Sequence, residues 1–241
     1  MVSSLVPTLA LMLVASGCSW PEYGYDAEGR GCNSSMLVCL NMDASPTEAG
    51  FIATQVGAAR FEVFPDEYRD NRTLRFETPG TEASPGPAAK LSWSPTSPIL
   101  AGRLMFDFRL AEIGPYTQVS IAELDFGERA LRFFLRSIPD GQSLSVQYTQ
   151  RDRASLVWEL SIPDQAFFQE TRFLELVYSV EPGTRMAAAY IEGAPVAQDF
   201  VLDEDWVPSG PSLHFGAFDH IVPTSQATFE LDNVGFDAPP R

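Results

Sequence analysis

Apolar and polar residues alternate along most of the chain after Gly50, with the period of two that places successive side chains on opposite faces of a β-strand. In residues 103–110, one face carries Leu104, Phe106, Phe108 and Leu110, and the other carries Arg103, Met105, Asp107 and Arg109. Similar runs predict strands at 51–56, 60–64, 73–77, 89–93, 117–126, 144–148, 156–162, 174–180, 187–191, 212–218 and 227–236. Strands of this kind are typical of antiparallel sheets that bury one face.

Turn signals separate these runs, at Pro139-Asp140-Gly141, Glu181-Pro182-Gly183, Glu192-Gly193-Ala194-Pro195 and Pro208-Ser209-Gly210-Pro211. One short helix is expected around residues 164–169. No internal repeat or second domain boundary interrupts the pattern. About a dozen strands with regular turns predict an all-β fold, a two-sheet antiparallel β-sandwich or jelly roll, over residues 50–241.

The stretch from Val119 to Arg136, VSIAELDFGERALRFFLR, is too long for one strand. Fully extended it would span about 60 Å, well beyond the usual length of a strand. Gly127 is the only turn former inside it. We therefore predict a hairpin whose loop is Phe126-Gly127-Glu128-Arg129.

The first 17 residues have no charged side chain, and their apolar run at residues 9–15 is too short to span a bilayer. This pattern fits a signal peptide. Ala15-Ser16-Gly17-Cys18 follows at once and resembles the lipobox of bacterial lipoproteins, although no Lys or Arg precedes it and Ala15 replaces the more usual leucine. The resemblance implies a lipid on Cys18 that anchors the chain to the cell envelope. If the cell is Gram-negative, it implies the outer membrane, because Ser19 is not the Asp that retains such lipoproteins at the inner membrane. The alternative is ordinary secretion, with Cys18 free or disulfide-bonded.

Residues 18–49 are expected to be a tether between this anchor and the sandwich. If Cys18 carries the lipid, Cys32 and Cys39 remain as a pair. Export favours disulfide formation, so we expect a Cys32–Cys39 bond that closes a short loop. With no second cysteine cluster, a metal site built on cysteine is not expected.

The formal net charge is −16, and Lys90 is the only lysine. Such a negative field disfavours binding to nucleic acid, and no basic run offsets it. A nucleic-acid partner is therefore not expected.

Three short motifs lie in the second half of the chain: the turn at residues 190–196, the run Leu213-His214-Phe215-Gly216, and the final strand at 229–236. Together they resemble the second half of a concanavalin A-like, laminin G-like jelly roll. The resemblance implies the fold of residues 50–236. It implies no activity, because this fold hosts lectins, hydrolases, lyases and adhesive modules.

Family sixteen glycoside hydrolases share that fold and carry a Glu-x-Asp-x-Glu motif, or the same motif with a bulge. By this resemblance Glu123 would be the nucleophile, Asp125 its helper and Glu128 the acid/base. The chemistry needs two carboxylates about 5 Å apart across the scissile bond. Glu128 would reach the face of Glu123 only if Gly127 formed a bulge. A hairpin turn at Gly127 would instead favour a protein without this catalysis.

Glycan binding needs exposed aromatic side chains beside polar groups. Tyr116 and Trp206 are the candidates, whereas Trp158 lies on an apolar face and is expected in the core.

No cofactor is expected, but the resemblance leaves calcium open, because Asp232 matches the position of a structural calcium ligand in the hydrolases. The alternative is that Asp232-Asn233 marks a bulge, where the buried face shifts from Leu231 to Val234. His214 and His220 show no metal-binding spacing, and no site is predicted for them.

These patterns predict an envelope-anchored bacterial lipoprotein with a lectin-like sandwich that binds a glycan or an envelope protein. Two alternatives remain. One is a glycoside hydrolase that uses Glu123, Asp125 and Glu128. The other is a structural envelope protein that binds no sugar.

Overall fold

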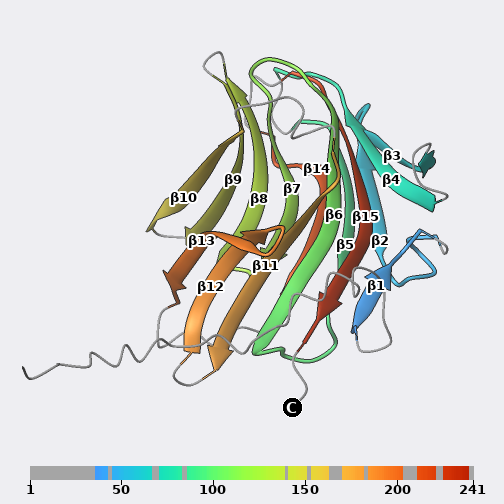
Figure 1. Cartoon of the computed structure of the whole chain (residues 1–241). Helices are drawn as coiled ribbons and strands as arrows, with labels where there is room; N and C mark the ends of the chain where they lie inside the picture. Colours follow the sequence, from blue (N-terminus) through green and yellow to red (C-terminus); the bar gives the residue numbers. More distant parts are fainter. Residues whose placement is uncertain are drawn as a thin grey trace, which may run out of the picture.

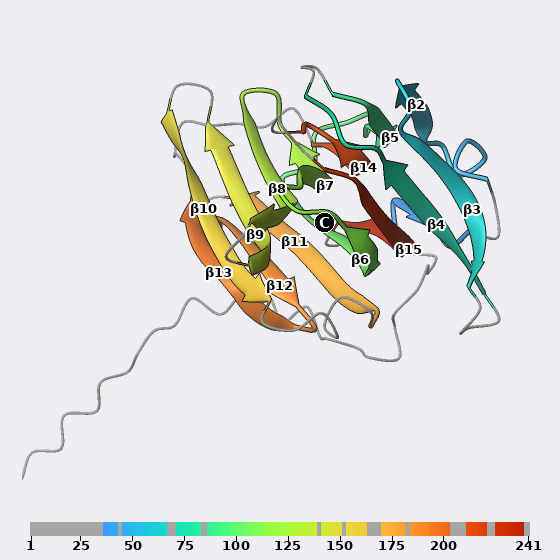
Figure 2. The ribbon, with the colours of Figure 1, turned by 90° about the horizontal axis from the view of Figure 1, so that it is seen from above.

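The computed structural model describes residues 36–42, 45–66, 71–82, 86–138, 141–150, 153–162, 170–181, 184–202, 211–220 and 225–238. Within these ranges the chain forms two antiparallel sheets packed face to face, as the alternating pattern predicts (Figures 1 and 2). None of these residues forms a helix long and apolar enough to cross a membrane. The short helix expected around residues 164–169 lies outside the described residues.

The first sheet, called sheet A, has the strand order β13-β12-β11-β6-β15-β4-β3, with β1 beside the second half of β15. Its strands are β1 (Val38–Leu40), β3 (Arg60–Asp66), β4 (Asn71–Thr78), β6 (Ala101–Ile113), β11 (Arg172–Glu181), β12 (Thr184–Ile191), β13 (Ala194–Val201) and β15 (Ala227–Asp237).

The second sheet, called sheet B, has the order β10-β9-β8-β7-β14-β5-β2. Its strands are β2 (Ile52–Val56), β5 (Ala88–Trp93), β7 (Gln118–Asp125), β8 (Arg129–Ile138), β9 (Gly141–Gln150), β10 (Arg153–Ile162) and β14 (Ser212–Phe218). Apart from β1 and β13, the strands of both sheets agree with the predicted ranges to within a few residues.

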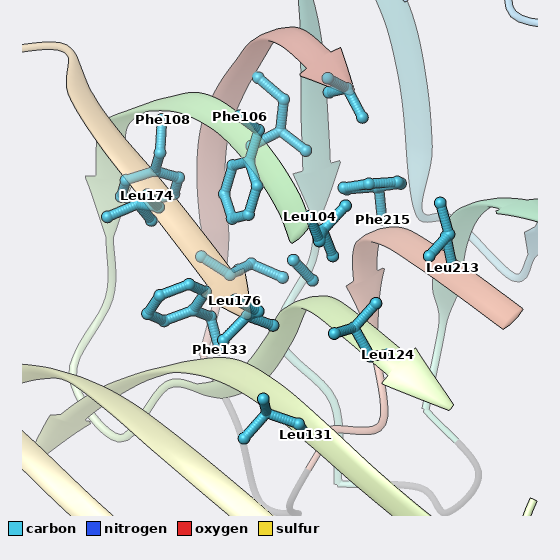
Figure 3. Packing of buried hydrophobic residues seen from close by; sticks show 14 of the residues in the cluster. Leu104, Phe106, Phe108, Leu124, Leu131, Phe133, Leu174, Leu176, Leu213 and Phe215 are labelled. Carbon is cyan, nitrogen blue, oxygen red and sulfur yellow. The ribbon is translucent and has the colours of Figure 1, made fainter. Parts of the chain in front are cut away.

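The core lies between the two sheets and is rich in phenylalanine and leucine (Figure 3). The predicted inward face of β6 is confirmed, since Leu104, Phe106, Phe108 and Leu110 are all buried. Phe106 links the layers, because its ring centroid lies 5.9 Å from those of Phe133 and Phe215 in sheet B. Burial of each such ring contributes about 1.5–3 kcal/mol to folding, which makes this contact a main source of stability.

The hairpin predicted at Gly127 is confirmed. Strands β7 and β8 pair directly, and the amide of Phe126 donates to the carbonyl of Arg129 at 2.8 Å. Gly127 has φ of +87°, a left-handed conformation that glycine adopts without steric cost. The three carboxylates of this stretch are thereby divided between a strand and a turn.

Two strands were not expected from the alternation. Strand β13 contains Pro195, which has no amide hydrogen for the ladder, and it is tolerated because β13 is an edge strand. Strand β1 lies within residues 18–49, which were expected to be tether, and it pairs with Val234–Phe236. Since Leu40 and Met42 are buried in the core, the sandwich begins before Gly50.

Candidate functional site

The loop between β6 and β7 is held firmly against the segment that precedes β15. The amide of Gly114 donates to the carbonyl of Gln226 at 2.8 Å. The hydroxyl of Thr117 lies 2.7 Å from the carbonyl oxygen of Gly114 and 3.1 Å from that of Gln226. Thr117 is fully buried, so this anchor is shielded from water. The loop therefore presents its tip in a fixed position.

Tyr116 forms that tip and is 55% exposed. Its φ is +62°, a conformation that costs a bulky residue of order 1–3 kcal/mol and persists where its surroundings impose it. The tyrosine borders a cleft of about 570 Å³, which we call the tyrosine cleft. Among the described residues, its lining includes Gly80, Thr81, Glu82, Gly114, Pro115, Tyr116, Ser225 and Gln226. An exposed aromatic ring thus adjoins hydroxyl, amide and carboxylate groups.

A second cleft, of about 980 Å³, lies at the opposite end of β6, beside Ala101. Leu37, Trp93 and Leu100 are among the residues that line it. Trp93 is partly buried there and packs on Phe236, with ring centroids 6.1 Å apart. The ring of Trp93 therefore packs against the core and is less available to a ligand than the ring of Tyr116. Of the other predicted aromatic residues, Trp206 and the side chain of Trp158 lie outside the described residues.

The predicted catalytic carboxylates are separated by the turn. Glu123 and Asp125 lie on the outer face of β7, opposite the core residues Ala122 and Leu124. Glu128 lies in the exposed turn after Gly127. The bulge that the hydrolase motif needs at Gly127 is therefore absent from this hairpin.

Glu123 is 6% exposed, although it lies on the outer face of sheet B. Its Oε2 lies 2.8 Å from Nη2 of Arg132, its register partner on β8. Burial raises the pKa of Glu123 to about 7; Arg132 opposes this rise, and the charges of Asp219 and Asp125 add to it. One arginine is therefore too little to compensate the burial of this carboxylate.

His214 on β14 is the register partner of Glu123 on the other side. Its Nδ1 lies 2.9 Å from the hydroxyl of Ser92, and its Nε2 lies 3.6 Å from Oδ2 of Asp125. Burial, and next the charge of Lys90, lower the pKa of His214, while Asp125 acts in the opposite direction. The structure thus brings Glu123, Asp125 and His214 together. The sequence does not reveal this group, because His214 lies 91 and 89 positions from the carboxylates and meets them only through the pairing of β14 with β7.

The bulge expected at Asp232-Asn233 is confirmed. Pairing with β6 shifts after Asp232, and Asn233 has φ of +49°. Leu231 and Val234 are both buried, on either side of the shift. Asp232 is 3% exposed and borders a cavity of about 10 Å³ that Asp107 and Thr73 also line.

That small cavity is about the size of one water molecule. The carboxylates of Asp107, Glu230 and Asp232 and the hydroxyls of Thr73 and Thr171 are the kind of oxygen ligand that calcium prefers, but the guanidinium of Arg109 lines the same cavity and would repel a cation. The side-chain amide of Asn233 already donates to Oδ2 of Asp107 at 2.9 Å, and its main-chain amide donates to Asp232 at 2.8 Å. Calcium binding by Asp232 therefore stays a prediction.

Cys39 in β1 is disulfide-bonded. Cys18 and Cys32 lie outside the described residues, so the lipid on Cys18 and the Cys32–Cys39 pairing stay predictions.

No protein-family model and no curated protein sequence matches this chain. Solved structures do. One of botulinum neurotoxin type C, whose cell entry depends on interaction with two ganglioside molecules, matches with a TM-score of 0.59 and 10% identity over 86% of this chain and 49% of that chain. The ligand-binding domain of botulinum neurotoxin serotype D, in complex with N-acetylneuraminic acid, matches with a TM-score of 0.55 and 13% identity over 85% of this chain and 47% of that chain.

The cellulose-induced protein Cip1 matches with a TM-score of 0.55 and 12% identity over 77% of this chain and 89% of that chain. This chain thus spans about half the length of the botulinum chains and most of the length of Cip1. At such low identities the likeness shows the fold alone: this chain is a two-sheet antiparallel β-sandwich.

Proposed function

We propose that this protein is an envelope-anchored bacterial lipoprotein whose concanavalin A-like sandwich binds a glycan in the tyrosine cleft without cleaving it. The observation that carries the proposal is Tyr116, whose exposed ring lies at the edge of a cleft and whose backbone has a left-handed conformation. A bulky residue in that conformation is a mark of functional sites, because the fold must bear its cost.

The lining of the tyrosine cleft suits a sugar. A pyranose ring has an apolar C–H face that can pack on the tyrosine ring, and its hydroxyls need hydrogen-bond partners. Thr81, Glu82 and Gln226 offer such groups along the same cleft. Two of the structures with a similar fold are of a botulinum neurotoxin whose cell entry depends on interaction with gangliosides and of a botulinum domain in complex with N-acetylneuraminic acid, which supports a glycan ligand here.

The position of the cleft also suits a protein anchored through its N-terminus. The described chain begins beside Leu37, at the cleft near the start of β6, whereas the tyrosine cleft lies beyond the end of β6. The 13 residues of β6 span about 40 Å. A chain anchored through Cys18 would therefore enter the sandwich at the end opposite the tyrosine cleft.

A glycan array probed with the full chain tests the binding. We expect Tyr116→Ala to abolish the signals, and Tyr116→Phe to retain them because the ring remains. Trp93→Ala is the matched control at the other end of β6, with its folding checked by circular dichroism. Loss of signal in Trp93→Ala with retention in Tyr116→Ala would place the ligand in the cleft near the start of β6 and would refute binding in the tyrosine cleft. An array with no signal for the wild-type chain would favour the structural alternative.

Two further experiments separate the remaining alternatives. A reducing-sugar assay on the same glycans should show no product for the wild-type chain. Activity that Glu123→Gln removes would establish the hydrolase instead. For the anchor, Cys18→Ser should release the protein from membranes and abolish acyl labelling, and unchanged membrane association would refute the lipid on Cys18.

A further inference from the structure

Three side chains from two neighbouring strands converge on the outer face of sheet B. Glu123 and Asp125 come from β7 and His214 from β14, and one possible ligand atom of each lies within 4.8 Å of the others. We propose that Glu123, Asp125 and His214 bind one first-row divalent transition-metal ion, such as Zn²⁺. This metal site is separate from the tyrosine cleft and does not depend on the proposed glycan binding.

The ligand set defines the class of ion. One imidazole nitrogen with two carboxylate oxygens suits zinc, cobalt or manganese, whereas calcium and magnesium prefer oxygen ligands alone. Three protein ligands leave a further position for water or for a group from a ligand, as in zinc sites that are open to solvent. Zn–N and Zn–O bonds of about 2.0–2.1 Å need ligand atoms about 3.4 Å apart, so small side-chain rotations would close the site.

Outer partners already orient two of the three ligands. The contact between Nδ1 of His214 and the Ser92 hydroxyl, at 2.9 Å, leaves Nε2 directed at Asp125. The amide of Gly127 donates to Oδ1 of Asp125 at 2.7 Å, which leaves Oδ2 toward the imidazole. Histidines and carboxylates that bind metals are commonly held in this way through their second heteroatom.

The incomplete compensation of the buried Glu123 carboxylate is an independent indication that it can bind a cation. Its side chain is 7% exposed, and Oε2 makes no hydrogen bond, even though Nη2 of Arg132 lies 2.8 Å away. The distance is that of an ion pair, but the N–H directions do not meet the oxygen. Buried polar atoms nearly always have a hydrogen-bond partner, so such an atom in a native site calls for an explanation. A metal ion bound by the carboxylate would provide one.

Charge and access also allow the ion to bind. Two carboxylates balance a divalent cation, and Arg132 has a second acidic partner in Asp219, 3.1 Å from its Nη1. The side chain of Asp125 is 38% exposed and that of His214 is 14% exposed. An ion can therefore enter beside Asp125, while Glu123 forms the buried side of the site.

Cobalt provides a direct test, because Co²⁺ bound by nitrogen and oxygen ligands has visible absorption bands. The full chain is treated with EDTA, dialysed and titrated with Co²⁺, and then with Zn²⁺ in competition. We expect saturable bands with one ion per chain. His214→Ala and Glu123→Gln should each weaken binding by at least about tenfold, and Ser92→Ala by a smaller factor through loss of orientation.

His220→Ala is the matched control, because the chain has only two histidines. It should bind Co²⁺ within about twofold of the wild-type affinity, since His220 lies outside the cluster. Circular dichroism and urea midpoints in EDTA verify that each variant folds. The proposal is overturned if the wild-type chain gives no bands, if intense thiolate bands assign the ion to cysteine, or if His214→Ala and His220→Ala bind alike. Tyr116→Ala should leave Co²⁺ binding unchanged.

Discussion

Each sheet places a buried glutamate on its outer face, away from the edge strands, and the two carboxylates differ in how their charge is compensated. Glu230 of sheet A is 2% exposed and lies in register between Arg75 and Arg109. Arg75 donates to Oε1 at 2.7 Å and 3.1 Å, and Arg109 donates twice to Oε2. Every oxygen of this buried carboxylate is therefore bonded.

Glu123 of sheet B lies on the central strand β7 but has one arginine partner, Arg132, on one side only. Its neighbour on the other side is His214, and Asp125 stands two residues along the same strand. Glu230 thus shows an arrangement that stabilises a buried glutamate, with an arginine on each side. At Glu123, one of these two arginines is replaced by His214, and the possible metal ligand Asp125 lies nearby. The comparison indicates a structural role for Glu230 and a binding role for Glu123.

The largest effect is expected from Glu230→Gln. Removal of one member of a buried charge network leaves the other members uncompensated, which costs about 3–5 kcal/mol. We expect the urea midpoint to fall accordingly, without effect on Co²⁺ or glycan binding. Glu62→Gln is the control, because Glu62 is the register partner of Arg75 on β3 and is exposed. A loss below 1 kcal/mol in Glu230→Gln would remove the contrast between the sheets.

Gly127→Ala is expected to have an intermediate effect. A Cβ atom at Gly127 would meet nothing within 4 Å, so the cost is confined to the left-handed backbone, about 1 kcal/mol. The same turn directs the Gly127 amide at Asp125. We therefore expect a small loss in urea stability together with weaker Co²⁺ binding. A stability loss as large as that of Glu230→Gln would show that the turn supports more than its own geometry.

Glu123→Gln should change stability by less than about 1 kcal/mol in the absence of metal. The neutral side chain avoids the cost of burying a poorly compensated charge, and this gain offsets the lost ion pair. Arg132 retains its contact with Asp219 at 3.1 Å. The urea midpoint in EDTA measures the change. A loss comparable to that of Glu230→Gln would mean that Glu123 is structural and would weaken the case for binding.

The sequence predicts most of this sandwich because its strands are half buried. The inward residues of β6 and the Gly127 turn follow from local patterns, and so does the bulge at Asp232-Asn233. Strand β13 does not, since Pro195 and the alanines around it lack the alternation of a typical strand. Strand β1 has three residues, too few to show any period.

The candidate site is harder to predict for a different reason. The carboxylates of Glu123 and Asp125 are visible from their spacing on one strand, but their surroundings depend on neighbours distant in sequence. His214 reaches them only because β14 pairs with β7 in one particular register. The conformation of Tyr116 likewise depends on Gln226, which holds its loop from 110 positions away. Strand order carries this information, and local patterns do not.

The smallest expected effect concerns Glu175. It lies on sheet A, as Glu230 does, but it has a single arginine partner, as Glu123 has. It has one arginine partner, Arg103, at 3.2 Å, and burial raises its pKa while Arg103 opposes the rise. A raised pKa in the folded state means that the folded chain binds more protons than the unfolded chain above the ordinary pKa of 4.5. The contribution of Glu175 to stability therefore falls as the pH rises through the interval between the two pKa values.

Glu175→Gln removes this titration, so the stability of the wild-type chain relative to the variant should be highest at acidic pH and lower at neutral pH. Urea unfolding of both proteins between about pH 4 and pH 8 measures the difference, and subtraction removes the titration of all other groups that the variant leaves unchanged. When both proteins also carry Arg103→Gln, the stability of the one that keeps Glu175 relative to the one with Glu175→Gln should fall more with pH, because the charge that opposes the raised pKa is gone. If the wild-type chain instead gained stability over the variant as the pH rose, Arg103 would compensate Glu175 fully. Glu175 would then belong with Glu230, and a single arginine would suffice to satisfy a buried glutamate on these sheets.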